Sequence, residues 1–235
     1  MLTALLWGAL AASSLLVGAA LAAVRPWRPA LVGTVLAFGA GALISGVAYD
    51  LAEEGLRQSG ALPVAVGITV GALSFYLANR AVGRLGGRDR GSGAGLPLAV
   101  GALLDGIPEQ AVLGIGLASG DGVSIALLVA IFISNVPEAV GSSADMLTGG
   151  RSRRGVLALW AAVGLVCVAA TVAGFSLADV AGPQLSGGID GFAAGALLVM
   201  LVDEMVPEAR SKTGTWAGLV TVLGFSLAAG LSQLT

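Results

Sequence analysis

Residues 29–49, PALVGTVLAFGAGALISGVAY, decide the fold because these 21 residues carry no charged side chain. A helix of about 20 mostly apolar residues crosses the hydrocarbon core of a bilayer, so the stretch predicts a transmembrane helix. Four further stretches without charge are 1–24, 58–79, 155–178 and 213–235. Three more candidates contain a few carboxylates and span 95–119, 122–148 and 188–208. The sequence therefore predicts an all-α membrane protein in which a single domain, 1–235, contains eight transmembrane helices.

The overall composition is that of a protein embedded in lipid. Of the 235 residues 56% are hydrophobic and 11% are charged, whereas a soluble domain carries about 25% charged residues. The net charge of −2 gives no reason to expect a nucleic-acid partner, and the absence of histidine removes imidazole from every candidate site. The one cysteine, Cys167, allows no disulfide within the chain. No motif for phosphate binding or covalent catalysis occurs, so we expect neither enzymatic activity nor a prosthetic group.

Basic residues gather on one side of the predicted topology. Only Arg57 falls in a loop on the opposite side. The others follow the first, third, fifth and seventh spans: Arg25, Arg28, Arg80, Arg84, Arg88, Arg90, Arg151, Arg153, Arg154, Arg210 and Lys212. Because loops rich in Lys and Arg remain cytoplasmic, we expect both termini to be extracellular. We place this integral membrane protein in the plasma membrane of a bacterium or an archaeon.

A repeat relates the two halves of the chain. The segment FGAGALI beginning at Phe38 leads to Asp50 and Glu54. The segment FAAGALL beginning at Phe192 leads to two further acidic residues at the same offset of 154 residues, Glu204 and Glu208. The two copies lie in the second and seventh spans, which cross the membrane in opposite directions. This predicts an inverted repeat, with the first three spans matching the last three around a central fourth and fifth; such repeats are typical of transporters.

The fourth and fifth spans each carry a polar motif that contains a proline. The fourth holds Asp105-Gly-Ile-Pro-Glu109, and the fifth holds Ser134-Asn135-Val-Pro-Glu138. Helical spacing of four residues places the first and last side chains of each motif on one face. A carboxylate inside a membrane is costly and marks a functional site by default. Neither span holds Lys or Arg, so a bound cation is the favoured interpretation; protonated carboxyls hydrogen-bonded across the helix pair are the alternative.

These motifs resemble those of the ZIP (Zrt/Irt-like) family of divalent-metal transporters. The segments that carry the resemblance are Asp-Gly-Ile-Pro-Glu-Gln at 105–110, Asn-Val-Pro-Glu-Ala at 135–139 and Val-Asp-Glu-Met-Val-Pro-Glu-Ala at 202–209. The resemblance implies that Glu109 and Glu138 ligate a metal midway across the membrane, and that Asn135 contributes a polar ligand. It also implies alternating access through movement of the helix bundle, and assembly as a homodimer.

Two positions depart from the family pattern. The family usually has His where this chain has Asp105 and Ser134, so the predicted metal site consists of side chains with oxygen ligands: Asp105, Glu109, Ser134, Asn135 and Glu138. Oxygen ligands suit Mg²⁺ and Mn²⁺, while imidazole and thiolate suit Zn²⁺. We therefore expect transport of a divalent metal of the zinc, manganese and iron class as substrate, with magnesium as a further candidate. The alternatives are a proton-coupled transporter of another solute, and a non-transporting scaffold or sensor.

Acidic residues at the ends of the spans form weaker candidates. Asp50 and Glu54 follow the second span on the extracellular side. Four others lie on the cytoplasmic side: Asp145, Asp203, Glu204 and Glu208. We interpret these six side chains as entry or exit positions for a cation, because the inverted repeat relates the two ends. Solvated interface carboxylates are the alternative.

The topology can be tested by cysteine-accessibility labelling. The loop from Arg151 to Arg154 is expected to face the cytoplasm, so a Ser152→Cys variant should react with a membrane-impermeant thiol reagent in inverted vesicles and not in intact cells. Reaction from outside intact cells would overturn the assigned orientation, and with it the direction of the repeat.

Overall fold

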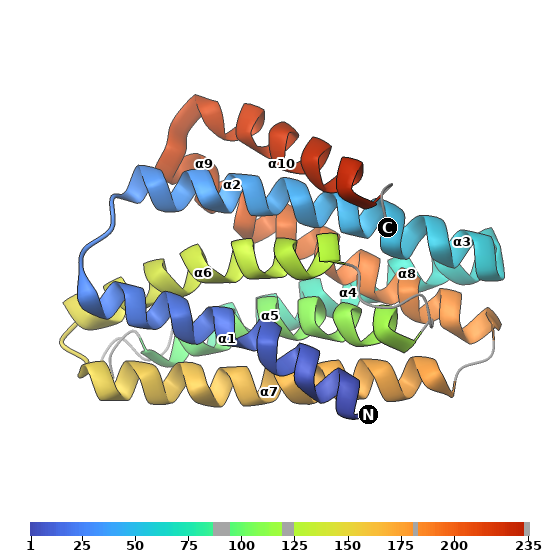
Figure 1. Cartoon of the computed structure of the whole chain (residues 1–235), viewed down its shortest axis with the longest axis horizontal. Helices are drawn as coiled ribbons and strands as arrows, with labels where there is room; N and C mark the ends of the chain where they lie inside the picture. Colours follow the sequence, from blue (N-terminus) through green and yellow to red (C-terminus); the bar gives the residue numbers. More distant parts are fainter. Residues whose placement is uncertain (87–94, 119–124, 181–182, 233–235) are drawn as a thin grey trace.

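A computed structural model describes residues 1–86, 95–118, 125–180 and 183–232, and within these ranges every regular element is a helix (Figure 1). The prediction of an all-α protein is confirmed. The elements in chain order are α1 (Leu2–Val24), α2 (Pro29–Gly46), η1 (Val47–Glu53), α3 (Glu54–Ser59), α4 (Ala61–Gly86), α5 (Gly95–Ala118), α6 (Ile125–Thr148), α7 (Arg153–Asp179), α8 (Pro183–Met200), η2 (Leu201–Met205), α9 (Val206–Thr213), η3 (Gly214–Trp216) and α10 (Ala217–Ser232). Of the three η elements, η1 and η2 are π-helical and η3 is a 3₁₀ turn.

Six stretches of the described chain are long and apolar enough to cross a membrane. They are Leu2–Val24, Pro29–Ser59, Ala61–Ala81, Leu127–Thr148, Arg153–Ala178 and Leu185–Leu231. The last has 47 residues, which as helix at 1.5 Å per residue would be about 70 Å long, more than twice the roughly 30 Å of a hydrocarbon core. These lengths and compositions are those of an integral membrane protein. The count of eight crossings stays a prediction.

The long helices lie side by side along one axis of the molecule (Figure 1). The connections between α1 and α2 and between α6 and α7 lie at the left end of that view. The start of α1, the end of α10 and the short helix α3 lie toward the right end. The basic connections around Arg25 and Arg151 are therefore at the opposite end of the bundle from α3 and Arg57.

Local features of the chain recur at the offset found in the sequence repeat. The π-helical segment η1 begins at Val47, and η2 begins 154 residues later at Leu201. Gly60, with φ 79°, follows α3, and Gly214, with φ 75°, follows α9 at the same offset. Glycine adopts this left-handed region without the steric cost that other residues meet there. Each copy of the sequence repeat thus continues into a π-helical segment, a short helix with a glutamate in its first turn and a glycine turn.

Glycines bring the backbones of two helix pairs into direct contact. The helix α4 packs most extensively against α8, and α2 packs closely against α10. A Cβ atom added at any of four glycines would collide with a carbonyl oxygen of the facing helix: Gly71 with Phe192, Gly195 with Ile68, Gly224 with Phe38, and Gly41 with Thr221. Small residues permit such approaches between membrane helices, where van der Waals packing drives association.

The interior of the bundle is formed by α2, α5, α6 and the facing side of α8. Leu43, Leu113, Ile131 and Leu197 are almost fully buried there. In contrast, α4 and α10 expose many large apolar side chains, including Leu73 and Leu77 on α4 and Leu219, Val222 and Leu223 on α10. In a bilayer these faces contact lipid. The helices that form this interior thus include those that carry the two proline motifs and both repeat segments.

The glycine contacts generate a stability prediction. Gly41→Ala and Gly71→Ala should each destabilise the protein by about 1–3 kcal/mol, because the new methyl group forces two backbones apart. Gly218→Ala on α10 is the matched control, since an added Cβ there meets no atom within 4 Å. Thermal unfolding of the detergent-purified variants should give lower midpoints for the first two only. Equal midpoints for all three variants would contradict the close contacts.

Candidate metal centre at the α5–α6 pair

Two proline-containing helices position the central polar side chains. Pro108 lies inside α5, and Pro137 lies inside α6. Each proline lacks the amide donor that would bond the carbonyl four residues earlier. Glu109, which follows the first proline, is only 1% exposed to solvent. Each of the two helices thus lacks one backbone hydrogen bond at its proline and carries a glutamate directly after that proline.

Glu109 meets α6 through a serine. The Ser134 Oγ lies 3.1 Å from Glu109 Oε1 and 3.0 Å from the Ile131 carbonyl oxygen. Since a hydroxyl carries a single proton, Ser134 can donate to one of these acceptors at a time. The backbone of Ser134 is in turn held by α2, where a Cβ on Gly39 would lie 3.1 Å from the Ser134 N and Cα atoms. The sequence predicted Glu109 and Ser134 in one site, and their side chains lie in hydrogen-bond contact.

Two buried polar atoms at this site have no hydrogen-bond partner among the described residues: Glu109 Oε2 and Asn135 Nδ2. Glu138, which is half-buried on α6, interacts electrostatically with Glu109. Neither α5 nor α6 carries Lys or Arg. Two neighbouring carboxyl groups in such a setting need a proton or a cation between them, because unpaired buried charge is strongly unfavourable.

The donor set within the described residues is incomplete for a tightly held metal. No three side chains of the types His, Cys, Asp and Glu lie close enough there to hold one ion. Asp105 belongs to α5, but its side chain lies outside the described part of the structure. The described oxygen-bearing side chains are those of Glu109, Glu138, Ser134 and Asn135. Whether Asp105 completes the set stays a prediction.

Three residues near the site were not found by sequence reasoning. Gln110 and Thr171 are fully buried, and the Thr171 hydroxyl donates to Gln110 Oε1 at 2.7 Å. Gln110 Nε2 has no partner among the described residues. Cys167, also on α7, interacts electrostatically with Glu109 and lies against Gly106, where a Cβ would be 2.7 Å from its Sγ. The uncharged face of α7 gave no signal in the sequence, although Thr171 and Cys167 share a helical spacing of four residues.

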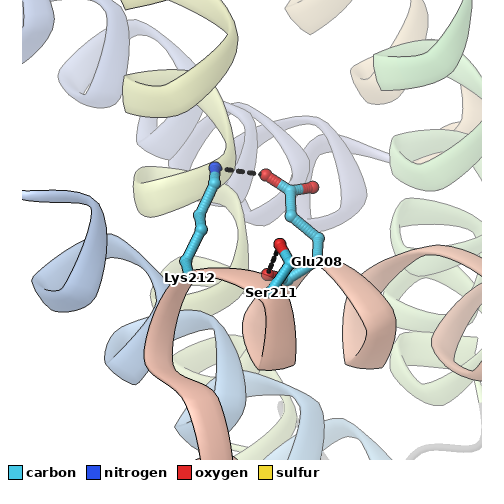
Figure 2. Close-up of polar contacts among 3 residues, drawn as sticks. All are labelled: Glu208, Ser211 and Lys212. Carbon is cyan, nitrogen blue, oxygen red and sulfur yellow. Dashed lines mark hydrogen bonds and ion pairs between the residues drawn. The ribbon is translucent and has the colours of Figure 1, made fainter.

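Three of the acidic residues at the bundle ends contact a polar or basic side chain: Glu54, Glu204 and Glu208. Lys212 Nζ lies 2.5 Å from Glu208 Oε1, and the Ser211 hydroxyl donates to the Glu208 carbonyl oxygen at 2.8 Å (Figure 2). At the equivalent position of the first repeat, Glu54 forms an ion pair with Arg57. The Asn79 amide on α4 donates to Glu204. Both repeated glutamates that follow the π-helical segments are therefore paired with a basic residue of their own helix.

The six rim residues do not all converge. Asp50 and Glu54 line one cavity at the α3 end. Asp145 on α6 and Asp203 on η2 are exposed. The role of these side chains as entry or exit positions stays a prediction.

Comparison with known proteins gives a distant relative. No protein-family model matches the chain. A protein of Arabidopsis thaliana named "Putative zinc transporter" is 28% identical to it over 190 residues, which is 77% of this chain and 30% of the relative. The chain thus spans about a third of the length of that relative.

The buried Gln110–Thr171 contact can be tested separately from the carboxylates. Thr171→Val keeps the side-chain shape but removes the hydroxyl, so it should cost about 1–3 kcal/mol by leaving the Gln110 amide without its donor. Thr69→Val is the control, because the exposed Thr69 hydroxyl bonds only the Ala65 carbonyl one turn earlier. Thermal unfolding should separate the two variants. A Thr171→Val midpoint as high as that of Thr69→Val would show that the contact adds no stability.

Proposed function

We propose that this protein transports divalent metal cations across a membrane, using the α5–α6 pair as the central binding site. The observation that carries the proposal is Glu109, which is buried between the two helices with one oxygen in contact with Ser134 and the other without a partner among the described residues. Glu138 lies within electrostatic reach, and no basic residue is present on either helix to neutralise the pair. A divalent cation supplies the missing positive charge.

The metal class follows from the ligands. Carboxylate, hydroxyl and amide oxygens bind manganese, iron and magnesium readily, and the general affinity order still places Zn²⁺ above Mn²⁺ and Fe²⁺. The name of the Arabidopsis relative includes zinc, and the two Pro-Glu motifs resemble the ZIP family. We therefore infer a ZIP-like transporter of the zinc, manganese and iron class. The His-free motif is expected to discriminate less strongly between these metals than a site with imidazole ligands.

An inverted repeat supplies a mechanism for alternating access. Its support comes from three matched features at an offset of 154 residues: the segments that begin with Phe and lead to acidic residues, the starts of η1 and η2, and the glycine turns at Gly60 and Gly214. The pairing of α4 with α8 mirrors that of α10 with α2. In transporters of this kind two repeats rock around a fixed midplane site. We infer eight crossings, with α5 and α6 as the fixed pair.

Flux measurements on purified protein test the proposal. Glu109→Gln and Glu138→Gln should each reduce the initial rate of Mn²⁺ or Zn²⁺ uptake into proteoliposomes by at least about tenfold, because each removes a charged ligand that nothing on α5 or α6 replaces. Glu53→Gln, at an exposed position of η1, should keep the wild-type rate. A central variant with full flux would move the site elsewhere.

The proton-relay alternative has a separate signature. A metal that binds only the native state raises its thermal stability, so Zn²⁺ or Mn²⁺ should raise the unfolding midpoint of the wild type and not that of Glu109→Gln. A wild type that transports protons but shows no metal-dependent stabilisation would favour the proton-coupled interpretation.

A further inference from the structure

A second acidic region lies at the α3 end of the bundle, away from the central pair. A partly open cavity of about 140 Å³ is lined there by η1, α3, the C-terminal ends of α5 and α7, and the first turns of α8. Its polar lining comes from Asp50, Glu54, Gln58, Ser186 and Asp190. On α5 the cavity is lined from Ile115 onward, six residues beyond Glu109, which is about 9 Å along a helix. The cavity is therefore distinct from the central site.

Asp190 is the unusual member of this lining. Asp190 is only 4% exposed. Its carboxyl group accepts no hydrogen bond from any described residue. Its recorded electrostatic neighbour is Glu54, a group of the same sign. A buried carboxyl group beside a second carboxyl group is unfavourable unless positive charge or a proton compensates it.

The negative charge of Glu54 is compensated only in part. Glu54 receives a hydrogen bond from the Gln58 amide at 2.6 Å and an ion pair from Arg57. Arg57 itself is 73% exposed, so its charge is largely screened by solvent. The apolar wall opposite, formed by Ile115, Ala118 and Ala178, lowers the local dielectric and strengthens attraction for a cation inside the cavity.

We propose that this cavity binds a partly hydrated divalent cation, with Asp190 as its principal anchor and Asp50 and Glu54 as flanking carboxylates. The volume holds an ion together with several water molecules. No three acidic side chains of the described residues are close enough to chelate one ion directly, so water completes the coordination. Such a site takes hard cations and binds them weakly. The inference rests on the proposed function, since it adds an outer binding position on the same cation route.

Counting bound Mn²⁺ by electron paramagnetic resonance tests the site directly. Free Mn²⁺ gives a sharp six-line signal that is lost on binding, so titration of purified protein up to about 1 mM, the range of the weakest protein Ca²⁺ sites, yields the number of ions per chain. We expect two ions for the wild type, one for Asp190→Asn, one for Glu109→Gln, and none for the double variant. Glu53→Gln is the matched control, because Glu53 is exposed and does not line the cavity.

The outcomes separate the two proposals. If the Asp190→Asn variant binds as many ions as the wild type, the outer site is overturned and the central site stands. If the Glu109→Gln variant binds as many ions as the wild type, the central site is overturned instead. Asp50→Asn provides a second test of the cavity, with at least a threefold weaker outer affinity expected, and unfolding midpoints measured without Mn²⁺ verify that each variant is folded. A wild type that binds one ion, lost in Glu109→Gln and retained in Asp190→Asn, shows that the cavity carboxyl is satisfied by a proton, which also overturns the inference.

Discussion

Close backbone contact at glycine is the constraint on which this bundle depends. Lipid tails are as apolar as leucine, so helices in a membrane gain no hydrophobic advantage from meeting each other. Their association must be stabilised by dense packing instead. The α2–α10 and α4–α8 pairs pack densely because each places glycines against carbonyl oxygens of the partner helix. The central helix α5 packs in the same way against α7, where a Cβ added at Gly114 or Gly174 would collide with a carbonyl oxygen of the facing helix. The central helices α5 and α6 can then carry prolines and carboxyl groups that would be unfavourable in an isolated helix.

The central site illustrates how polarity is confined within such a frame. Glu109 is surrounded by a hydroxyl from its neighbouring helix and by a second carboxyl group, with no fixed positive charge on α5 or α6. The basic side chains are held at the bundle ends, where Lys212 and Arg57 pair with glutamates of their own helices. Positive charge is thus available at the ends and absent from the middle. The cation that we propose for the middle would meet no tethered positive charge on α5 or α6.

Much of this arrangement was predictable from the sequence because it depends on short, strongly patterned segments. Long uncharged runs identify membrane helices, and the two Pro-Glu motifs identify Glu109 and Glu138 through the cost of burying charge. Gln110, Thr171 and Cys167 were not predictable, because uncharged polar side chains in a membrane helix are common and helical spacing alone does not say which face meets α5. Asp190 was counted only as a charge tolerated within a span, since its burial depends on how α3 and α8 pack together.

The π-helical segments have a consequence for how the chain can vary in length. A regular α-helix turns by about 100° per residue, and a π-helical segment accommodates an extra residue within its turn. Deleting one residue between Val47 and Glu53 would convert the segment to a regular α-helix and leave α3 close to its present rotation relative to α2, so Glu54 would keep its direction. The same holds for η2 and Glu208. The π-helical segments are therefore positions where the chain can lose one residue without redirecting the helix that follows.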